Sequence, residues 1–434
     1  HAPAFPTVET AVLDNGLELR VARRPGVRSV DFALVFDNGA QLDPRGLEGL
    51  SIVTLGALDA GTARRTKHDL SRFFQEMGIG YSVNVRKDMA TMSMSTLKNG
   101  LADAMACMAE LLLEPAFPEQ ELRLFLDRHV ANARGRAVAP GNAAEMAVAR
   151  LIYGPRHAYT PFTAGTAQSL SALTLDRIGE RHRNWLDPRR ARLVIAGDLT
   201  LDEAREFAER AFGQWTGKVD LAVPEPGPWE PAPGRYFIER PGHAQSALCI
   251  AMASPEIRFG REELTLFNSL FGGSFGSRLN ANLRERKGWT YGAGSGFGIN
   301  PLIGGFHIRT DVQADHTLDA LAEVEAELRA LSGARPVTHE EIETARHAML
   351  IGLPGVWSTN VAVVNAMIEQ IVYALPQDHH DHVEERIRAI GQEDVQAVAD
   401  LVGDPSRYAW IVAGDGAFID GAGHVSIDAE GNVQ

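Results

Sequence analysis

Arg284 and Tyr291 are the two residues of this 434-residue chain whose types and spacing point most directly to chemistry. They lie seven positions apart, and Gly288 between them can end a helix that carries the arginine. Tyr291 would then start the next strand, and both side chains can reach one peptide carbonyl. Alone, this spacing is weak evidence, and a surface helix arginine with an ordinary strand aromatic is then the better interpretation.

A glycine-rich turn, "LFGGSFGSRLN", comes directly before this pair and favours a functional reading of it. We predict that Gly272, Gly273, Ser274 and Gly276 form a loop that contacts substrate. Simple turn chemistry is the alternative, because glycine and serine are also the residues that tight turns require.

Two other segments contain residues of the kind that bind metals. His339, Glu343 and His347 share one helix face, but the first and last are about 12 Å apart along the axis and cannot hold the same ion. A solvated face is the better interpretation. The segment "DHHDH" (378–382) lies in a polar turn and could chelate adventitious metal. We therefore predict no metal site of the chain's own.

Alternating and helical patterns predict the elements that position these residues. Strands are expected over 17–24, 29–36, 192–198 and 408–415, a hairpin over 81–97 with Met92 and Met94 on one face, and helices over 46–62, 101–113 and 201–212. Thr338 and Glu341 occupy capping-box positions at a helix start. Strands and helices interleave without regular alternation, so we predict an α+β fold with helices packed on mixed sheets.

The chain contains an internal repeat. "DPRRARLVIAGD" at 187–198 recurs as "DPSRYAWIVAGD" at 404–415, an offset of 217, and an R-P-G turn recurs at an offset of 216. A tandem duplication fits the whole length. We predict homologous domains over 1–217 and 218–434, joined by a stiff proline-rich linker at about 219–234.

The net charge of −14 is carried by the second half. Residues 1–217 hold 26 basic and 26 acidic side chains, and residues 218–434 hold 16 and 30. This balance argues against nucleic acid as a partner. Acidic stretches such as 315–327 are interpreted as solvated helix faces, with a preference for basic ligands as the alternative.

The remaining features of the sequence say less about function. Cys107 and Cys249 lie in apolar runs and are expected to be buried thiols. No apolar run approaches the roughly 18 residues that a bilayer requires, so we expect a soluble chain. The chain begins His1-Ala2-Pro3 without methionine, which suggests a removed leader or a trimmed end.

The helical segment 46–62, "GLEGLSIVTLGALDAGT", resembles the metal helix of the pitrilysin/insulysin family, the clamshell-shaped inverted zincins. In that family the helix carries H-x-x-E-H, where two histidines bind zinc and the glutamate activates water. The flanking Gly-Leu and Gly-Thr place this pentad at 52–56. There Ile52 and Gly56 replace the histidines and Leu55 replaces the glutamate. The family's third ligand is expected near Asn132, in a window (128–140) without an acidic residue.

The resemblance continues over 270–298, where Arg284 and Tyr291 match a pair that the family's C-terminal half brings over the zinc. It implies that the tyrosine hydroxyl holds the substrate oxygen as negative charge develops. Some family members work as two-chain pairs in which one subunit lacks H-x-x-E-H and donates this pair. This chain resembles such an inactive subunit, so the resemblance implies a homologous, zinc-bearing partner in a heterodimer and a peptide substrate.

Two alternatives to this function stay open: a structural assembly subunit, and a stand-alone peptide-binding protein. We expect an exported, periplasmic location, with the cytoplasm as the alternative. No cofactor is expected in this chain.

Overall fold

The computed structural model describes residues 5–221, 225–257, 260–419, 423–429 and 432–434. The first residues, His1-Ala2-Pro3, and residues 222–224 of the predicted linker lie outside this part. The chain forms two compact units. Unit 1 comprises residues 1–133, 161–225 and 354–381, and unit 2 comprises residues 134–160, 226–353 and 382–434.

Unit 1 is built on a six-stranded mixed sheet with the order β1-β2-β6-β3-β5-β4. Its strands are β1 (Val8–Val12), β2 (Glu18–Arg23), β3 (Ser29–Phe36), β4 (Gly80–Val85), β5 (Ala90–Leu97) and β6 (Ala191–Gly197). Strands β2 and β6 pair in parallel, and the other neighbours are antiparallel. The predicted strands and the predicted hairpin are confirmed, and β4 is an edge strand.

Unit 2 repeats this design with the order β12-β7-β11-β8-β10-β9. Its strands are β7 (Gly234–Glu239), β8 (Gln245–Ser254), β9 (Ala293–Gly298), β10 (Gly304–Gln313), β11 (Ala409–Gly414) and β12 (Val425–Ser426). Strands β7 and β11 pair in parallel, as β2 and β6 do. The α+β class with two homologous mixed sheets is therefore confirmed.

One backbone contact appears at equivalent places in both units. The amide of Gly26 donates to Asp198 Oδ2 at 3.0 Å, and the amide of Gly242 donates to Asp415 Oδ2 at 2.7 Å. Both glycines have positive φ, +82° and +75°. A residue with a Cβ is strained in that conformation, which explains why the R-P-G turn is kept in both repeats.

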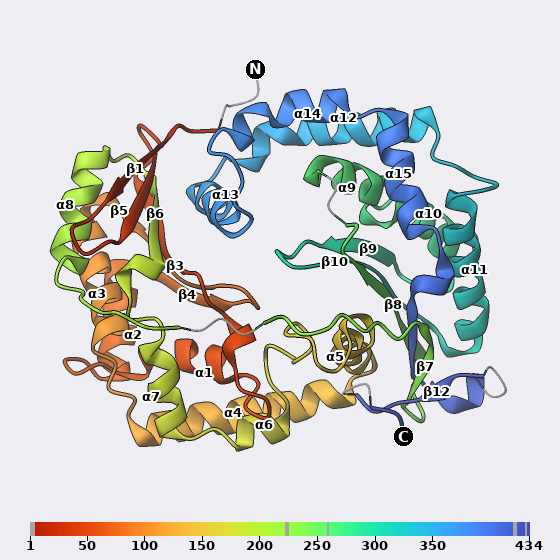
Figure 1. The fold of residues 1–434 in the computed structure, drawn as a ribbon, viewed down its shortest axis with the longest axis horizontal. Helices are drawn as coiled ribbons and strands as arrows, with labels where there is room; N and C mark the ends of the chain where they lie inside the picture. The colour runs from red at the N-terminus through yellow and green to blue at the C-terminus, as the bar shows by residue number, and fades with distance from the viewer. Residues whose placement is uncertain (1–4, 222–224, 258–259, 420–422, 430–431) are drawn as a thin grey trace. The chain divides into compact units, whose positions relative to one another are not determined.

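Helices surround both sheets (Figure 1). Unit 1 contains α1 (Leu50–Gly56), α2 (Lys67–Met77), α3 (Leu101–Leu113), most of α4 (Glu119–Val138), α6 (Ala167–Ser171), α7 (Leu175–Arg183), α8 (Leu201–Phe212) and α13 (Asn360–Val372). Unit 2 contains α5 (Pro140–Tyr153), α9 (Arg261–Asn268), α10 (Arg278–Asn280), α11 (Thr317–Leu331), most of α12 (His339–Val356), α14 (Val383–Ala389) and α15 (Gln392–Val402). The predicted helices over 101–113 and 201–212 are confirmed as α3 and α8.

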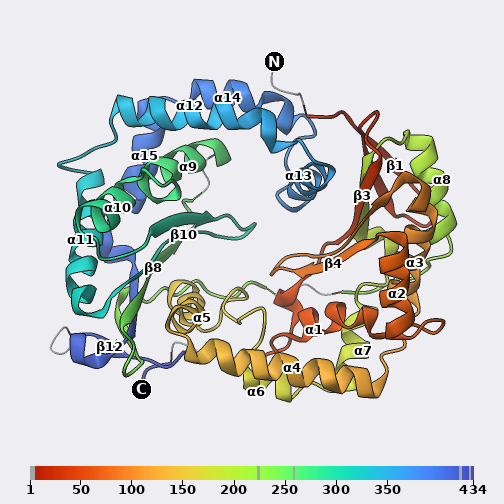
Figure 2. The same cartoon turned by 180° about the vertical axis from the view of Figure 1, so that it is seen from behind.

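Each unit takes one helix from the other half of the sequence. Helix α13 packs on β3 and β6 in unit 1, and helix α5 packs on β8 and β11 in unit 2. Figures 1 and 2 show α13 on the face of the first sheet opposite α3 and α8. The two helices occupy equivalent positions of the repeat, so the exchange is reciprocal.

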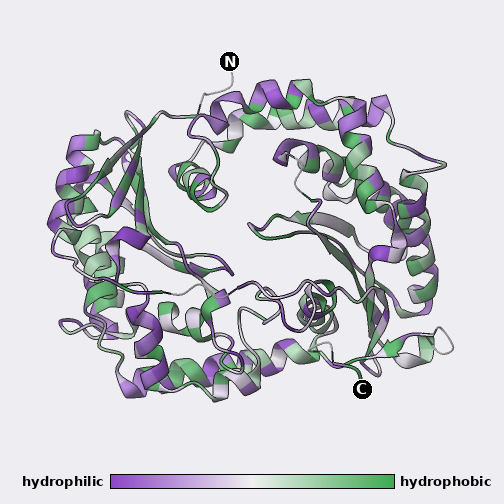
Figure 3. Ribbon diagram, viewed as in Figure 1, coloured by the Kyte–Doolittle hydropathy of each residue, from purple (hydrophilic) through white to green (hydrophobic). Residues whose placement is uncertain are grey.

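The cores lie between the sheets and these helices. The central strands carry hydrophobic residues, and the surrounding helices carry both hydrophobic and hydrophilic ones (Figure 3). Met92 and Met94 are buried in the core of unit 1 as predicted, and Cys107 and Cys249 are buried free thiols. No single helix in the described ranges is long and apolar enough to cross a bilayer, and only the bent pair α12–α13 reaches that length and composition.

The start of α12 is fixed to α10 by a partly buried ion pair. Thr338 and Glu341 form the predicted capping box. The Glu341 carboxylate also accepts two hydrogen bonds from Arg278, at 2.6 and 2.7 Å. Burial raises the pKa of Glu341, but the hydrogen bonds from Arg278 and Thr338 outweigh it and bring the pKa down to about 2.

We predict that Glu341→Gln lowers the free energy of unfolding by about 2 to 3 kcal/mol at pH 7. A carboxylate whose pKa is lower in the folded state stabilises the folded protein at pH values above its ordinary pKa. This contribution is lost as the pH falls toward about 2, the pKa of Glu341 in the folded state. Urea unfolding should therefore show roughly half this difference at pH 3. Glu340→Gln, one position earlier, is the matched control. A difference that stays constant between the two pH values would contradict the prediction.

Candidate functional site

The helix predicted over 46–62, in the segment that resembles the zinc helix, is too long: only α1 is α-helical, and a short 3-10 turn (Leu58–Ala60) follows it. Its side chains fill space in the core. Leu55 is fully buried in the main core of unit 1, and Ile52 is half-buried beside it. A Cβ added to Gly56 would lie 3.0 Å from the Phe125 ring of α4. Therefore α1 presents no metal-binding atom at the three degenerate positions.

A buried polar network holds the N-terminus of α1. The Asp43 carboxylate accepts hydrogen bonds from the amides of Gly49 and Ser51 and from the Ser51 hydroxyl. Arg181 donates to Ser51 Oγ at 2.8 Å and lies 3.8 Å from Asp43. Burial raises the pKa of Asp43 to about 6 and lowers the pKa of Arg181 to about 10. The network has a structural role, since it satisfies the first amides of the helix.

The position of the family's third ligand also lacks a donor suited to zinc. Asn132 lies exposed on α4, two turns after Phe125. Within the described ranges, no group of three or more histidine, cysteine or acidic side chains is placed to hold a metal ion. The residues present at α1 and α4 do not fit zinc.

The other metal candidates have ordinary surroundings. His339, Glu343 and His347 are exposed on α12, and Glu343 pairs with Arg346. In the "DHHDH" turn, His380 is buried and contacts the Ala366 carbonyl oxygen at 3.3 Å. These positions agree with the interpretation as a solvated face and a structural turn.

Arg284 lies in unit 2, in the π-helical turn η6 (Ala281–Arg286) that continues α10. Its guanidinium carbon lies 3.8 Å from the centroid of the Phe275 ring. Phe275 belongs to the glycine-rich turn and is 67% exposed. The turn is thus joined to the predicted arginine by a cation–π contact. Phe275 was not among the site residues predicted from the sequence.

Tyr291 is 95% exposed, and its hydroxyl has no hydrogen-bond partner among the described residues. The prediction that it starts a strand is wrong, because β9 begins two residues later, at Ala293. Gly288, with φ +70°, lies two residues after the end of η6, in agreement with the prediction that it ends the helix. An exposed phenol without a partner is available to a ligand or another chain.

The predicted substrate loop divides into two parts. A side chain on Gly272 or Gly273, in the π-helical turn η5 (Ser269–Gly273), would collide with Ser295 or Asn268. These two glycines are explained by close packing. Gly276 has open space around it, and with Ser274 it lines a cavity of about 620 Å³ beside α12. Substrate contact by the four residues stays a prediction.

Comparison with known proteins identifies the family. Residues 21–138 match the family described as Insulinase (Peptidase family M16), and residues 172–349 match the Peptidase M16 inactive domain. A Bacillus subtilis protein described as the uncharacterized zinc protease YmxG is 22% identical over 339 residues, which cover 77% of this chain and 81% of that protein. An uncharacterized zinc protease of Rickettsia bellii is 24% identical over 341 residues, covering 77% and 80%.

Solved structures show the same fold. The peptidase M16 inactive domain of Pseudomonas fluorescens aligns with a TM-score of 0.84 at 22% identity, covering 94% of this chain and 98% of that one. A protease from Helicobacter pylori aligns with a TM-score of 0.86 at 16% identity, covering 94% and 99%. The matches and the side chains of α1 fit a non-catalytic member. The chain belongs to the M16 peptidase family.

Proposed function

We propose that this chain is the zinc-less subunit of a two-chain M16 peptidase, which binds peptide and donates Arg284 and Tyr291 to its partner's active site. The proposal is carried by the combination of a family fold that lacks zinc ligands with an exposed tyrosine in the other unit. The chain has the family's fold, with side chains at α1 that cannot bind zinc, and in unit 2 it holds Tyr291 almost fully exposed with its hydroxyl unused.

The two donors suit a peptide carbonyl. A guanidinium and a phenol hydroxyl both donate hydrogen bonds, and donors aimed at a developing oxyanion commonly contribute most to the catalysis of acyl transfer. Arg284 rests on Phe275, so its stacking contact restricts the guanidinium without using its N–H groups. Zinc and its activated water would be supplied by the partner chain. This chain's residues would orient and polarise the carbonyl.

Unit 1 offers a place for the peptide backbone. Strand β4 is the edge of its sheet, and α1 lies alongside it. The outward backbone groups of an edge strand pair readily with an extended peptide. We therefore propose that the substrate adds to β4 as a further strand. A periplasmic or otherwise exported location stays a prediction.

We predict that the purified chain contains no stoichiometric zinc and cleaves no peptide. The triple variant Ile52→His, Leu55→Glu, Gly56→His should not gain robust activity either. The glutamate would enter the core, the second histidine would meet Phe125, and no carboxylate replaces Asn132. Metal analysis and a peptide-cleavage assay with and without chelator check this. Near-equimolar zinc with chelator-sensitive turnover would show that the placement of the ligands is wrong.

In the reconstituted pair, Tyr291→Phe should lower kcat by roughly 10- to 1000-fold and leave assembly intact. The change removes one exposed hydroxyl that has no partner within the described chain, so folding should not suffer. Arg284→Ala should lower kcat/KM at least as much, because a charged donor is lost. Turnover is compared with wild type, and assembly is checked by size exclusion.

The alternatives predict a different result in this assay. A structural assembly subunit would leave the partner's activity unchanged in both variants. A stand-alone peptide-binding protein would form no complex with a zinc-bearing chain.

A further inference from the structure

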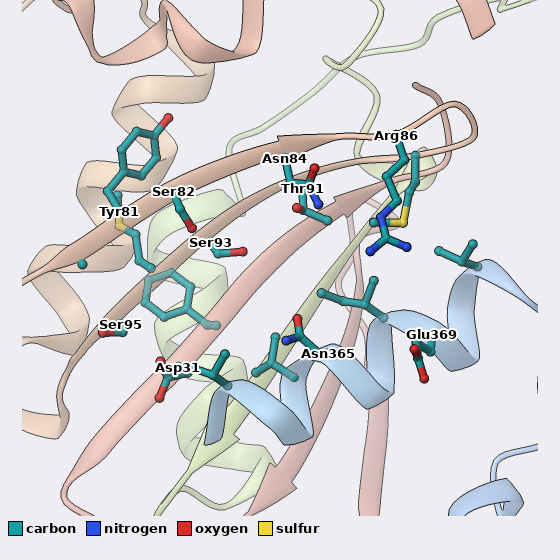
Figure 4. Close-up of a pocket in the computed structure, with 18 of the residues that line it drawn as sticks. Asp31, Tyr81, Ser82, Asn84, Arg86, Thr91, Ser93, Ser95, Asn365 and Glu369 are labelled. Atoms are coloured by element: carbon teal, nitrogen blue, oxygen red, sulfur yellow. The ribbon is translucent and has the colours of Figure 1, made fainter. Parts of the chain in front are cut away.

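A cavity of about 630 Å³ lies in unit 1 between the β4–β5 hairpin and helix α13 (Figure 4). We call it the hairpin groove. Its sheet wall includes three cross-strand pairs, Gly80 with Ser95, Ser82 with Ser93, and Asn84 with Thr91. Its helix wall presents Val361, Val364, Asn365 and Ile368 from α13.

The groove exists because α13 covers only part of the sheet. The helix packs on β3 and β6. Beyond them, β5 directs Met92 and Met94 into the core and, by alternation, turns its small polar side chains toward the groove. Both faces of a fully covered sheet would be apolar. The polar strip on β4 and β5 therefore faces the open space between the sheet and α13.

Several donors in the groove are free. Thr91 is only 5% exposed, yet its hydroxyl has no hydrogen-bond partner within the described part of the chain, where buried hydroxyls normally have one. The amides of Asn84 and Asn365 and the hydroxyl of Ser93 likewise have none among the described residues. Figure 4 shows these side chains around one open space.

Arg86 supplies the charge. It follows β4 directly, and its guanidinium reaches into the groove toward α13 (Figure 4). Its backbone is fixed: the amide donates to the Met89 carbonyl at 2.8 Å, and its carbonyl accepts from the Ala40 amide at 2.8 Å. No described residue forms an ion pair or side-chain hydrogen bond with the guanidinium. The backbone that carries this cation is held in place, and the cation has no counterion among the described residues.

The acidic groups of the groove do not neutralise Arg86. Asp31 lies at the other end, paired in register with Ser95, and burial raises the pKa of its carboxyl group. Ser95 lies four positions after Thr91 on β5, which is about 13 Å of strand. Glu369 on α13 already has an interaction of its own.

We propose that the hairpin groove binds a carboxylate of an extended peptide, which Arg86 holds in a bidentate pair while Thr91 and Asn84 donate hydrogen bonds. A planar guanidinium matches the two oxygens of a carboxylate. The carboxylate comes from an acidic side chain or from the peptide's C-terminus. This inference rests on the proposed function only in that the ligand is a peptide, and it needs no partner chain.

Isothermal titration calorimetry of the full chain with three N-acetylated hexapeptides tests the proposal. All three have the same alanine and valine background: one with an internal Glu and an amidated end, one with Gln and an amidated end, one with Gln and a free C-terminal carboxylate. We expect a peptide with a carboxylate to bind roughly 10- to 100-fold more tightly than the neutral one. The tighter of the two charged peptides identifies the source.

Variants of Arg86 show whether this residue causes the tighter binding of peptides that carry a carboxylate. Arg86→Gln should abolish the discrimination, and Arg86→Glu should favour a peptide with Lys in place of Glu. Arg210→Gln, on the exposed face of α8, removes the same charge outside the groove and should change nothing. Equal binding of all three peptides, or discrimination that survives Arg86→Gln, would overturn the carboxylate site and leave peptide binding intact. Absence of binding by any peptide would overturn the groove itself, while the Tyr291 assay would still test the proposed subunit function.

Discussion

The close packing of Phe125 against Gly56 is the constraint that decides whether α1 can bind zinc, and the proposed function depends on it. At the position where the family's second histidine would stand, α1 has no side chain, and an aromatic ring of α4 fills the adjoining space. Leu55, one residue earlier, is committed to the core. The helix is kept because Asp43, Ser51 and Arg181 satisfy its first turn and its apolar face packs. Helix α1 therefore has a structural role, and any catalytic contribution of this chain comes from side chains outside α1.

The duplicated fold places polar and hydrogen-bonding side chains at one edge strand of each sheet, and the two edges differ in their side chains. In unit 1, the edge strand β4 carries Ser82 and Asn84 beside a free cation, Arg86. In unit 2, the edge strand β9 carries alternate glycines and follows the exposed Tyr291 by two residues. One architecture thus presents a polar surface suited to holding a peptide and, separately, a donor suited to its carbonyl. In the proposed function, peptide binding is therefore assigned to unit 1 and polarisation of the carbonyl to unit 2.

Much of the fold could be predicted because local pattern and burial agree. Alternation predicted β3 over its observed range, and helical spacing predicted α3 and α8. The exchange of α5 and α13 could not be predicted, because periodicity shows that a helix has an apolar face and does not show which sheet covers it. The contact of Phe275 with Arg284 was missed for a related reason: an exposed aromatic in a turn has no periodic signal. Arg86 was missed because a single arginine after a strand looks like any surface charge.

The central claim is that this chain works with a zinc-bearing relative, and purification of the complex from its native source tests it most directly. Tagged at one end, the chain should bring down a homologous chain that carries H-x-x-E-H, with about one zinc per pair of chains, in keeping with a single catalytic site of three protein ligands. Isolation of the chain alone and without metal, or with zinc bound in proportion to this chain in the absence of a partner, would contradict the account.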